Sequence, residues 1–101
     1  MLRRKLWPHE REMFIQQAGG NDGGVCIYCK RVHTSNKELM KRLPHIFFST
    51  WEIDHIIPLH HGGNNLNSNL HAVCQRCNQL KRDHTLSTFY TKLSHVKTSR
   101  R

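Results

Sequence analysis

The chain has 101 residues, with 16 Lys and Arg against 7 Asp and Glu, and a formal net charge of +9 with its histidines neutral. A chain of this length forms one domain, and its apolar core needs an additional stabilising element. The charge favours a negatively charged partner, nucleic acid first and an anionic membrane second, with solubility alone as the remaining explanation. No segment has the length of a membrane span, and no long Lys-rich amphipathic helix is visible, so a membrane partner is disfavoured.

The two ends of the chain are basic, at residues 1–5 and 97–101. The first of these arms is expected to be mobile until it meets a polyanion. No apolar stretch of a secretory signal follows it, which predicts a reducing, cytoplasmic compartment. A helix is predicted from His9 to Ala18 with Pro8 in its first turn, and a turn cluster follows at residues 21–24.

Two Cys-x-x-Cys pairs are present, Cys26 with Cys29 and Cys74 with Cys77. Four thiolates complete a tetrahedral zinc site with no open position, and such a site adds its binding energy to folding. Two disulfides are the alternative, disfavoured by the spacing and by the lack of a secretory signal. A closed zinc site holds no water to activate, so any catalytic metal needs other ligands, with oxygen or nitrogen atoms.

The middle of the chain predicts a short helix and then a strand. The helix begins at Ser35, with Glu38 at the capping-box position, and ends before Pro44. An aromatic and β-branched run leads into a strand from Trp51 to His55, and Pro58 ends it. The aromatic side chains of this run are predicted to lie in the core rather than to stack on bases: Phe47, Phe48 and Trp51.

The remaining elements follow a turn-rich connection, residues 60–68. A second strand is predicted from Asn69 to Val73, antiparallel to the first. A helix from Asn78 to Asp83 comes after the second cysteine pair, and a last helix is capped by Thr85 or Ser87.

Between residues 54 and 81 the chain carries an ordered set of motifs: Asp54-His55-x-x-Pro58, Gly62-Gly63, Asn69-Leu70, Cys74-x-x-Cys77-Asn78 and Lys81. This set resembles the HNH endonucleases, and small phage and prophage members are similar in size and cysteine layout. The resemblance implies an α+β fold in a single domain, residues 1–101. Its zinc-stapled ββα-metal core would cover about residues 50–84, with short flanking helices.

The resemblance also implies roles for four side chains. His55 would be the general base, which suits an imidazole because it is neutral near physiological pH. Asp54 and Asn78 would hold one Mg²⁺ or Mn²⁺, and Asn69 would brace the loop that orients the histidine. Since an amide oxygen is a weaker transition-metal ligand than imidazole, Ni²⁺ and Zn²⁺ are disfavoured. Neighbours in a strand face opposite sides, so the backbone is expected to twist at His55.

Further basic and imidazole side chains are candidates for contacts with DNA or with a metal ion. Contacts with DNA phosphates are predicted for three residues, with a solvated charged face as the alternative: Arg76, Lys81 and Arg82. A surface or structural role is predicted for four histidines, of which the last is the best additional ligand: His60, His61, His71 and His84.

The sequence therefore predicts a metal-dependent DNA endonuclease that nicks DNA or cuts both strands and leaves 5′-phosphate and 3′-hydroxyl ends. It would act as a monomer or weak dimer in the cytoplasm of a bacterium or phage-infected cell, with a phage terminase as a candidate partner. The alternative is a non-catalytic, zinc-stabilised DNA-binding module. Such a module would keep the cysteines and the charge but would not need Asp54, His55 and Asn78 together.

Overall fold

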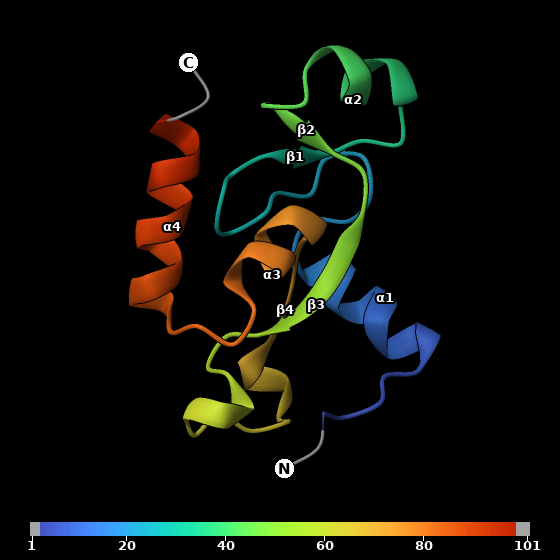
Figure 1. The fold of residues 1–101 in the computed structure, drawn as a ribbon. Helices are drawn as coiled ribbons and strands as arrows, with labels where there is room; N and C mark the ends of the chain where they lie inside the picture. Colours follow the sequence, from blue (N-terminus) through green and yellow to red (C-terminus); the bar gives the residue numbers. More distant parts are fainter. Residues whose placement is uncertain (1–2, 99–101) are drawn as a thin grey trace.

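The centre of the fold is a β-hairpin followed directly by a helix: β3 (Trp51–His55), β4 (Leu70–Cys74) and α3 (Gln75–Lys81). A computed structural model of the chain describes residues 3–98, so residues 1–2 and 99–101 of the predicted basic termini lie outside the described residues. Figure 1 shows α3 packed across the hairpin, with α4 beside it. The predicted α+β architecture with a ββα core is confirmed.

The hairpin is antiparallel, with Trp51 opposite Cys74 and His55 opposite Leu70. β3 has the predicted bounds, and β4 begins one residue later than predicted. Three consecutive residues of β4 are fully buried, Ala72, Val73 and Cys74, so both faces of this strand are covered. α1 and α3 both contact the hairpin and provide this cover.

The second cysteine pair forms the first turn of α3. Cys74 is the N-cap, and its Sγ accepts a hydrogen bond from the backbone N–H of Cys77 at 3.3 Å. The helix therefore begins before the predicted start at Asn78. It also ends earlier than predicted, because Arg82 has a φ of 51° and leaves the helical conformation.

Helix α1 (Pro8–Gln17) matches the helix predicted after the basic arm within one residue. Pro8 occupies its first turn, and the Glu10 carboxylate accepts a hydrogen bond from the backbone N–H of Trp7 at 3.1 Å. These contacts fix the helix start. Phe14 and Ile15 are its buried residues, and they attach it to the core.

Helix α4 (Leu86–Thr98) closes the other side of α3. Of the two predicted caps, Thr85 is the one used, because its Oγ1 accepts a hydrogen bond from the N–H of Thr88 at 3.4 Å. Phe89 and Leu93 are buried, as expected for the inner face of this helix.

A small parallel sheet was not predicted: β1 (Val32–His33) pairs with β2 (Phe47–Phe48). Two-residue strands carry too little periodicity to be recognised in a sequence. The core prediction holds for Phe48 and Trp51, whose rings meet edge to face at 4.8 Å, whereas Phe47 is half-buried.

Helix α2 (Lys37–Arg42) connects β1 to β2. The predicted cap, Ser35, is wrong. Asn36 is the N-cap, and its Oδ1 accepts hydrogen bonds from the N–H groups of Glu38 and Leu39. Ser35 instead donates its hydroxyl to Asp22, which anchors the helix entry to an earlier loop.

The connection between β3 and β4 contains two short 3-10 helices, η1 (Leu59–His61) and η2 (Asn67–Asn69). Gly62 ends η1 with a φ of 91°, and a side chain at Gly63 would collide with the backbone carbonyl of Ile57. The two glycines therefore let this loop fold tightly over the end of β3. Within residues 3–98, the helices fall short of the length and apolar character that a membrane span requires.

Candidate active site and zinc centre

The four cysteines form one buried cluster whose Sγ atoms all lie within 4.8 Å of one another. The Sγ atoms of Cys29 and Cys74 are 3.7 Å apart. That separation exceeds a disulfide bond of about 2.05 Å. It matches the edge of about 3.8 Å of a tetrahedron with Zn–S arms of about 2.3 Å. The cluster thus fits a structural zinc, and all four cysteines are free rather than paired as disulfides.

Arg31, which sequence reasoning missed, is buried beside this cluster. Its Nε lies 3.4 Å from Cys29 Sγ and its Nη2 lies 3.2 Å from Cys74 Sγ. Hydrogen bonds from neighbouring thiols, Cys26 first, and from Arg31 lower the pKa of Cys29 below its usual range. The guanidinium therefore offsets part of the negative charge that four thiolates bring to a zinc ion.

Asp54 lies on β3 and is 3 % exposed. The Tyr28 hydroxyl donates to its Oδ2 at 2.7 Å, and the Lys81 ammonium lies 3.0 Å from Oδ2 and 3.3 Å from Oδ1. Burial, followed by the neighbouring Asp54 carboxylate, raises the pKa of Tyr28 above its usual range, so the phenol keeps the proton it donates. A buried carboxylate is thus held in one orientation by two donors.

Lys81 was predicted to contact DNA phosphates, and the structure corrects this prediction. Its side chain is fully buried and also donates to the backbone carbonyl of His55 at 2.8 Å. The position three residues after Asn78 turns the ammonium toward β3 rather than toward solvent. Lys81 therefore supports Asp54 from inside the domain.

His55 ends β3 and is 7 % exposed. Its Nε2 lies 2.8 Å from Oδ1 of Asn65, and its Nδ1 is buried with no hydrogen-bond partner among the described residues. Both Asp54 and His55 line a cavity of about 300 Å³, although they are neighbours in a strand. The strand ends at His55, so the cavity wraps around its end and reaches both side chains.

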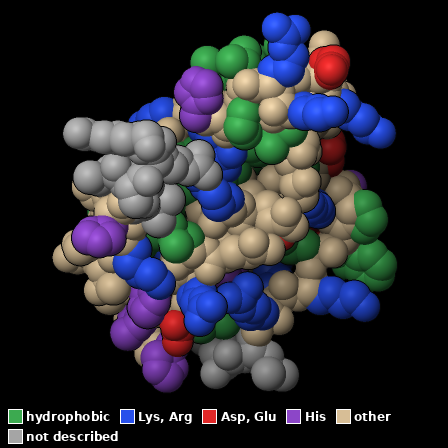
Figure 2. Space-filling view, turned by 45° about the horizontal axis from the view of Figure 1, so that its top comes forward, with side chains coloured by type: hydrophobic (Ala, Val, Ile, Leu, Met, Phe, Trp, Pro, Cys, Tyr) green, Lys and Arg blue, Asp and Glu red, His purple; other side chains and the backbone are tan. Residues whose placement is uncertain are grey.

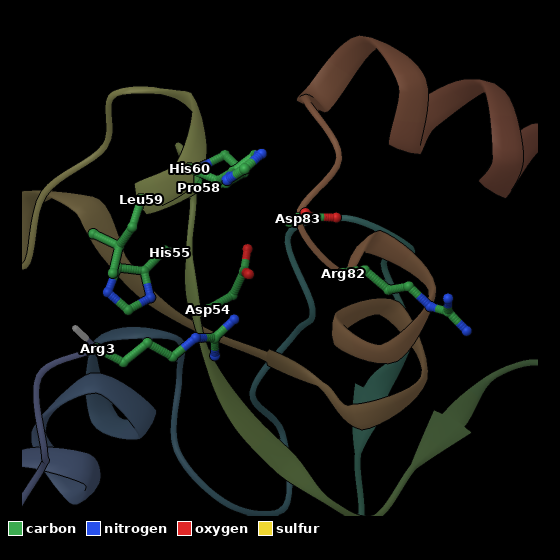
Figure 3. Close-up of a pocket in the computed structure, with 8 residues that line it drawn as sticks. All are labelled: Arg3, Asp54, His55, Pro58, Leu59, His60, Arg82 and Asp83. Atoms are coloured by element: carbon green, nitrogen blue, oxygen red, sulfur yellow. The ribbon is translucent and has the colours of Figure 1, made fainter. Parts of the chain in front are cut away.

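The cavity joins side chains from four parts of the chain: Arg3, Asp54, His55, Pro58, Leu59, His60, Arg82 and Asp83. Figure 3 shows the Asp54 carboxylate pointing into the space between His55 on one side and Asp83 on the other. His60 belongs to this lining and His84 does not, whereas the prediction of His84 as the best additional ligand stays a prediction. The sequence offered no signal for Arg3 or Asp83.

Asn69 lies where the predicted brace was expected. Its Oδ1 accepts from the N–H of Ile57 at 2.8 Å, and its Nδ2 donates to the carbonyls of Ile57 at 2.9 Å and Asn64 at 2.8 Å. These bonds tie the two sides of the β3–β4 connection together. Among the described residues, the side chain that hydrogen-bonds to the imidazole is Asn65.

Asn78 is not among the residues that line the cavity. Its Nδ2 donates to Oε1 of Glu52 at 2.7 Å, one turn of α3 before the Lys81–Asp54 pair. Its role as a metal ligand stays a prediction, and it requires the side chain to turn away from Glu52.

The donor set on the cavity suits a hard divalent cation. Asp54 and Asp83 bring carboxylate oxygens, and His60 brings an imidazole nitrogen. Mg²⁺ and Mn²⁺ are commonly held by one or two carboxylates, with water and phosphate oxygens completing the shell. Among the described residues, the only group of three or more Cys, His, Asp or Glu side chains that converges on one point is the cysteine cluster. Any ion bound in the cavity would therefore have few protein ligands, and water and substrate oxygens would complete its coordination shell.

We expect Lys81→Met to lower the free energy of unfolding by about 3–5 kcal/mol, because it leaves the buried Asp54 carboxylate without its cationic partner. Mn²⁺ should then raise the melting temperature of the variant more than that of the wild type, since the ion can take over the vacant charge. Lys37→Met, at an exposed position of α2, serves as the control. Equal melting temperatures of the Lys81→Met variant and the wild type would refute the pairing.

Comparison with known protein families identifies a family for this chain. The family model described as HNH endonuclease matches residues 26–84, which include both cysteine pairs, the β3–β4 hairpin and α3. No match to a curated protein was found.

Proposed function

The chain belongs to the HNH endonuclease family, and from that premise we propose that it hydrolyses phosphodiester bonds of DNA with His55 as the general base. The observation that carries this proposal is that His55, whose buried Nδ1 has no hydrogen-bond partner among the described residues, lines the same cavity as Asp54. A ring nitrogen with a free lone pair beside a charged, partly enclosed space is suited to taking a proton from water.

In the proposed reaction, His55 takes a proton from a water molecule whose oxygen attacks the phosphorus atom. The new P–O bond forms as the bond from phosphorus to the 3′ oxygen breaks, and the departing 3′ oxygen takes a proton from solvent water, which leaves a 5′-phosphate and a 3′-hydroxyl. Asp54, with Asn78 or Asp83 as a second oxygen donor, would hold one Mg²⁺ or Mn²⁺. Such an ion stabilises negative charge on the phosphate and on the departing oxygen.

Basic side chains near the cavity are proposed to hold the DNA strand. Arg3 and Arg82 line the cavity itself, and Arg76 lies at the other end of α3, where its Nε and Nη1 are buried without a partner among the described residues. Figure 2 shows Lys and Arg side chains spread over one face of the molecule with few acidic ones between them. A positive face of this kind favours phosphate binding.

The biological setting is also part of this proposal: a monomer or weak dimer, a cytoplasmic location and a terminase as partner. One proposed active site in one domain most naturally nicks one strand. Double-strand cleavage would require a dimer or two separate encounters.

Incubation of supercoiled plasmid with the zinc-loaded protein tests the proposed function. We expect conversion to the nicked form with Mg²⁺ or Mn²⁺ and none without a divalent cation, and end mapping should find 5′-phosphates. The zinc content is measured before and after, so that loss of the structural ion is not mistaken for loss of the catalytic one. DNA binding without cleavage under every metal condition would instead favour the non-catalytic module.

A further inference from the structure

The hydrogen bonds around Asn65 determine which nitrogen of His55 carries a proton. The backbone N–H of Arg4 donates to the atom placed as Asn65 Oδ1 at 3.1 Å. A backbone N–H requires an acceptor, so this atom is the amide oxygen and not the amide nitrogen. His55 Nε2 lies 2.8 Å from the same oxygen. Since an oxygen there only accepts, Nε2 must be the protonated nitrogen of the ring.

The other ring nitrogen is then the one with the lone pair. In a neutral imidazole with a proton on Nε2, Nδ1 is an acceptor. Nδ1 of His55 has no hydrogen-bond partner among residues 3–98, and the residue lines the cavity beside Asp54. The atom left free by the Asn65 contact is thus the hydrogen-bond acceptor of the ring.

Asn65 is itself held in place by the N-terminal arm. Arg4 Nη1 donates to the backbone carbonyl of Asn65 at 3.1 Å and to Oδ1 of Asn67 at 2.6 Å. The same guanidinium pairs with Glu10 at the start of α1. Arg4, in the arm predicted to be mobile, is therefore tied to the β3–β4 connection. It links α1 to the residue that contacts the imidazole.

We propose that Asn65, oriented by the backbone of Arg4, is a positioning residue that keeps His55 in the Nε2–H tautomer and so presents Nδ1 as the basic nitrogen. The assignment of that nitrogen to catalysis rests on the proposed nuclease function. The tautomer itself does not, so the two can be tested separately.

Nitrogen NMR of the histidine rings tests the tautomer directly. Spectra are recorded on ¹⁵N-labelled, zinc-loaded protein at a pH where the imidazoles are neutral, and the His55 signals are assigned by their loss in His55→Gln. We expect Nε2 of His55 at the frequency of a protonated nitrogen and Nδ1 at that of an unprotonated one. The reverse pattern in the wild type would overturn the proposal, whether or not any variant folds.

Variants of Asn65 provide the second arm of the test. Asn65→Ala should give a mixture of His55 tautomers, whereas Asn65→Asp keeps an acceptor and should retain the wild-type pattern. Asn67→Ala is the matched control, because it removes an Arg4 contact but leaves the Asn65–His55 bond in place. An unchanged tautomer in Asn65→Ala would overturn the proposal.

Kinetics connect the tautomer to function. Asn65→Ala should lower kcat for plasmid nicking on the order of 100-fold. The Kd for DNA should stay unchanged, because Asn65 contributes no charge. If the wild type shows no cleavage at all, the proposed function fails while the NMR result still decides the role of Asn65. A fall in DNA affinity with kcat unchanged would assign Asn65 to DNA binding and overturn the positioning role.

Discussion

His55→Ala is expected to abolish plasmid cleavage while DNA binding and folding persist. A positioned general base contributes about 10²–10⁴-fold to a rate, so the loss should be at least in this range. The variant removes the imidazole, whose buried Nδ1 has no hydrogen-bond partner among the described residues, but leaves Asp54, Tyr28 and Lys81 in contact with one another. The measurement is the initial nicking rate with Mn²⁺, compared at equal occupancy of DNA.

Two controls make this result specific. His61→Ala, in η1 but outside the cavity lining, should cut at nearly the wild-type rate. His60→Ala, whose ring lines the cavity, should lose less than His55→Ala and should require more Mn²⁺ if the imidazole is a ligand. Wild-type cutting by His55→Ala would remove the base from the proposed mechanism, and cleavage would then need another proton acceptor.

The parts of this fold that were predictable are those with a strong local pattern. β3 runs from Trp51 to His55 as predicted because aromatic and β-branched residues lead up to its polar end. The cluster of four cysteines was predictable because two Cys-x-x-Cys pairs have the spacing of a structural zinc site. Each of these patterns lies within a short stretch of sequence. It can be recognised without knowing which other elements pack against it.

The parts that were missed depend on contacts between distant residues. Asn65 contacts His55 where Arg4 of the N-terminal arm lies against the β3–β4 connection. The pattern of apolar residues in the sequence does not predict that contact. Lys81 was expected at the surface because it lies among charged residues, yet its position on α3 directs it at Asp54. Tyr28 lies between two cysteines and shows its role only when Asp54 is brought beside it.

Removal of the zinc site is expected to unfold the domain. Structural zinc contributes an apparent binding free energy of about 10–16 kcal/mol in small zinc proteins. The free energy of unfolding of a whole domain is about 5–15 kcal/mol. Cys26 and Cys29 precede β1, whereas Cys74 and Cys77 join β4 to α3, so loss of the ion breaks a link between the segment before β1 and the hairpin and helix. Cys74→Ser should therefore show little secondary structure by circular dichroism at 25 °C.

A comparison of Arg31→Met with Cys74→Ser separates the effect of zinc binding from the effect of side-chain packing around the cysteine cluster. Arg31→Met removes the donors to Cys29 and Cys74 but leaves all four ligands, so zinc affinity should fall about 10- to 100-fold. The variant should fold with excess Zn²⁺ and lose its structure at a lower chelator concentration than the wild type. A Cys74→Ser variant as stable as the wild type would contradict a structural zinc. It would also contradict the idea that such a zinc keeps the β3–β4 hairpin, and the cavity residues on it, rigid.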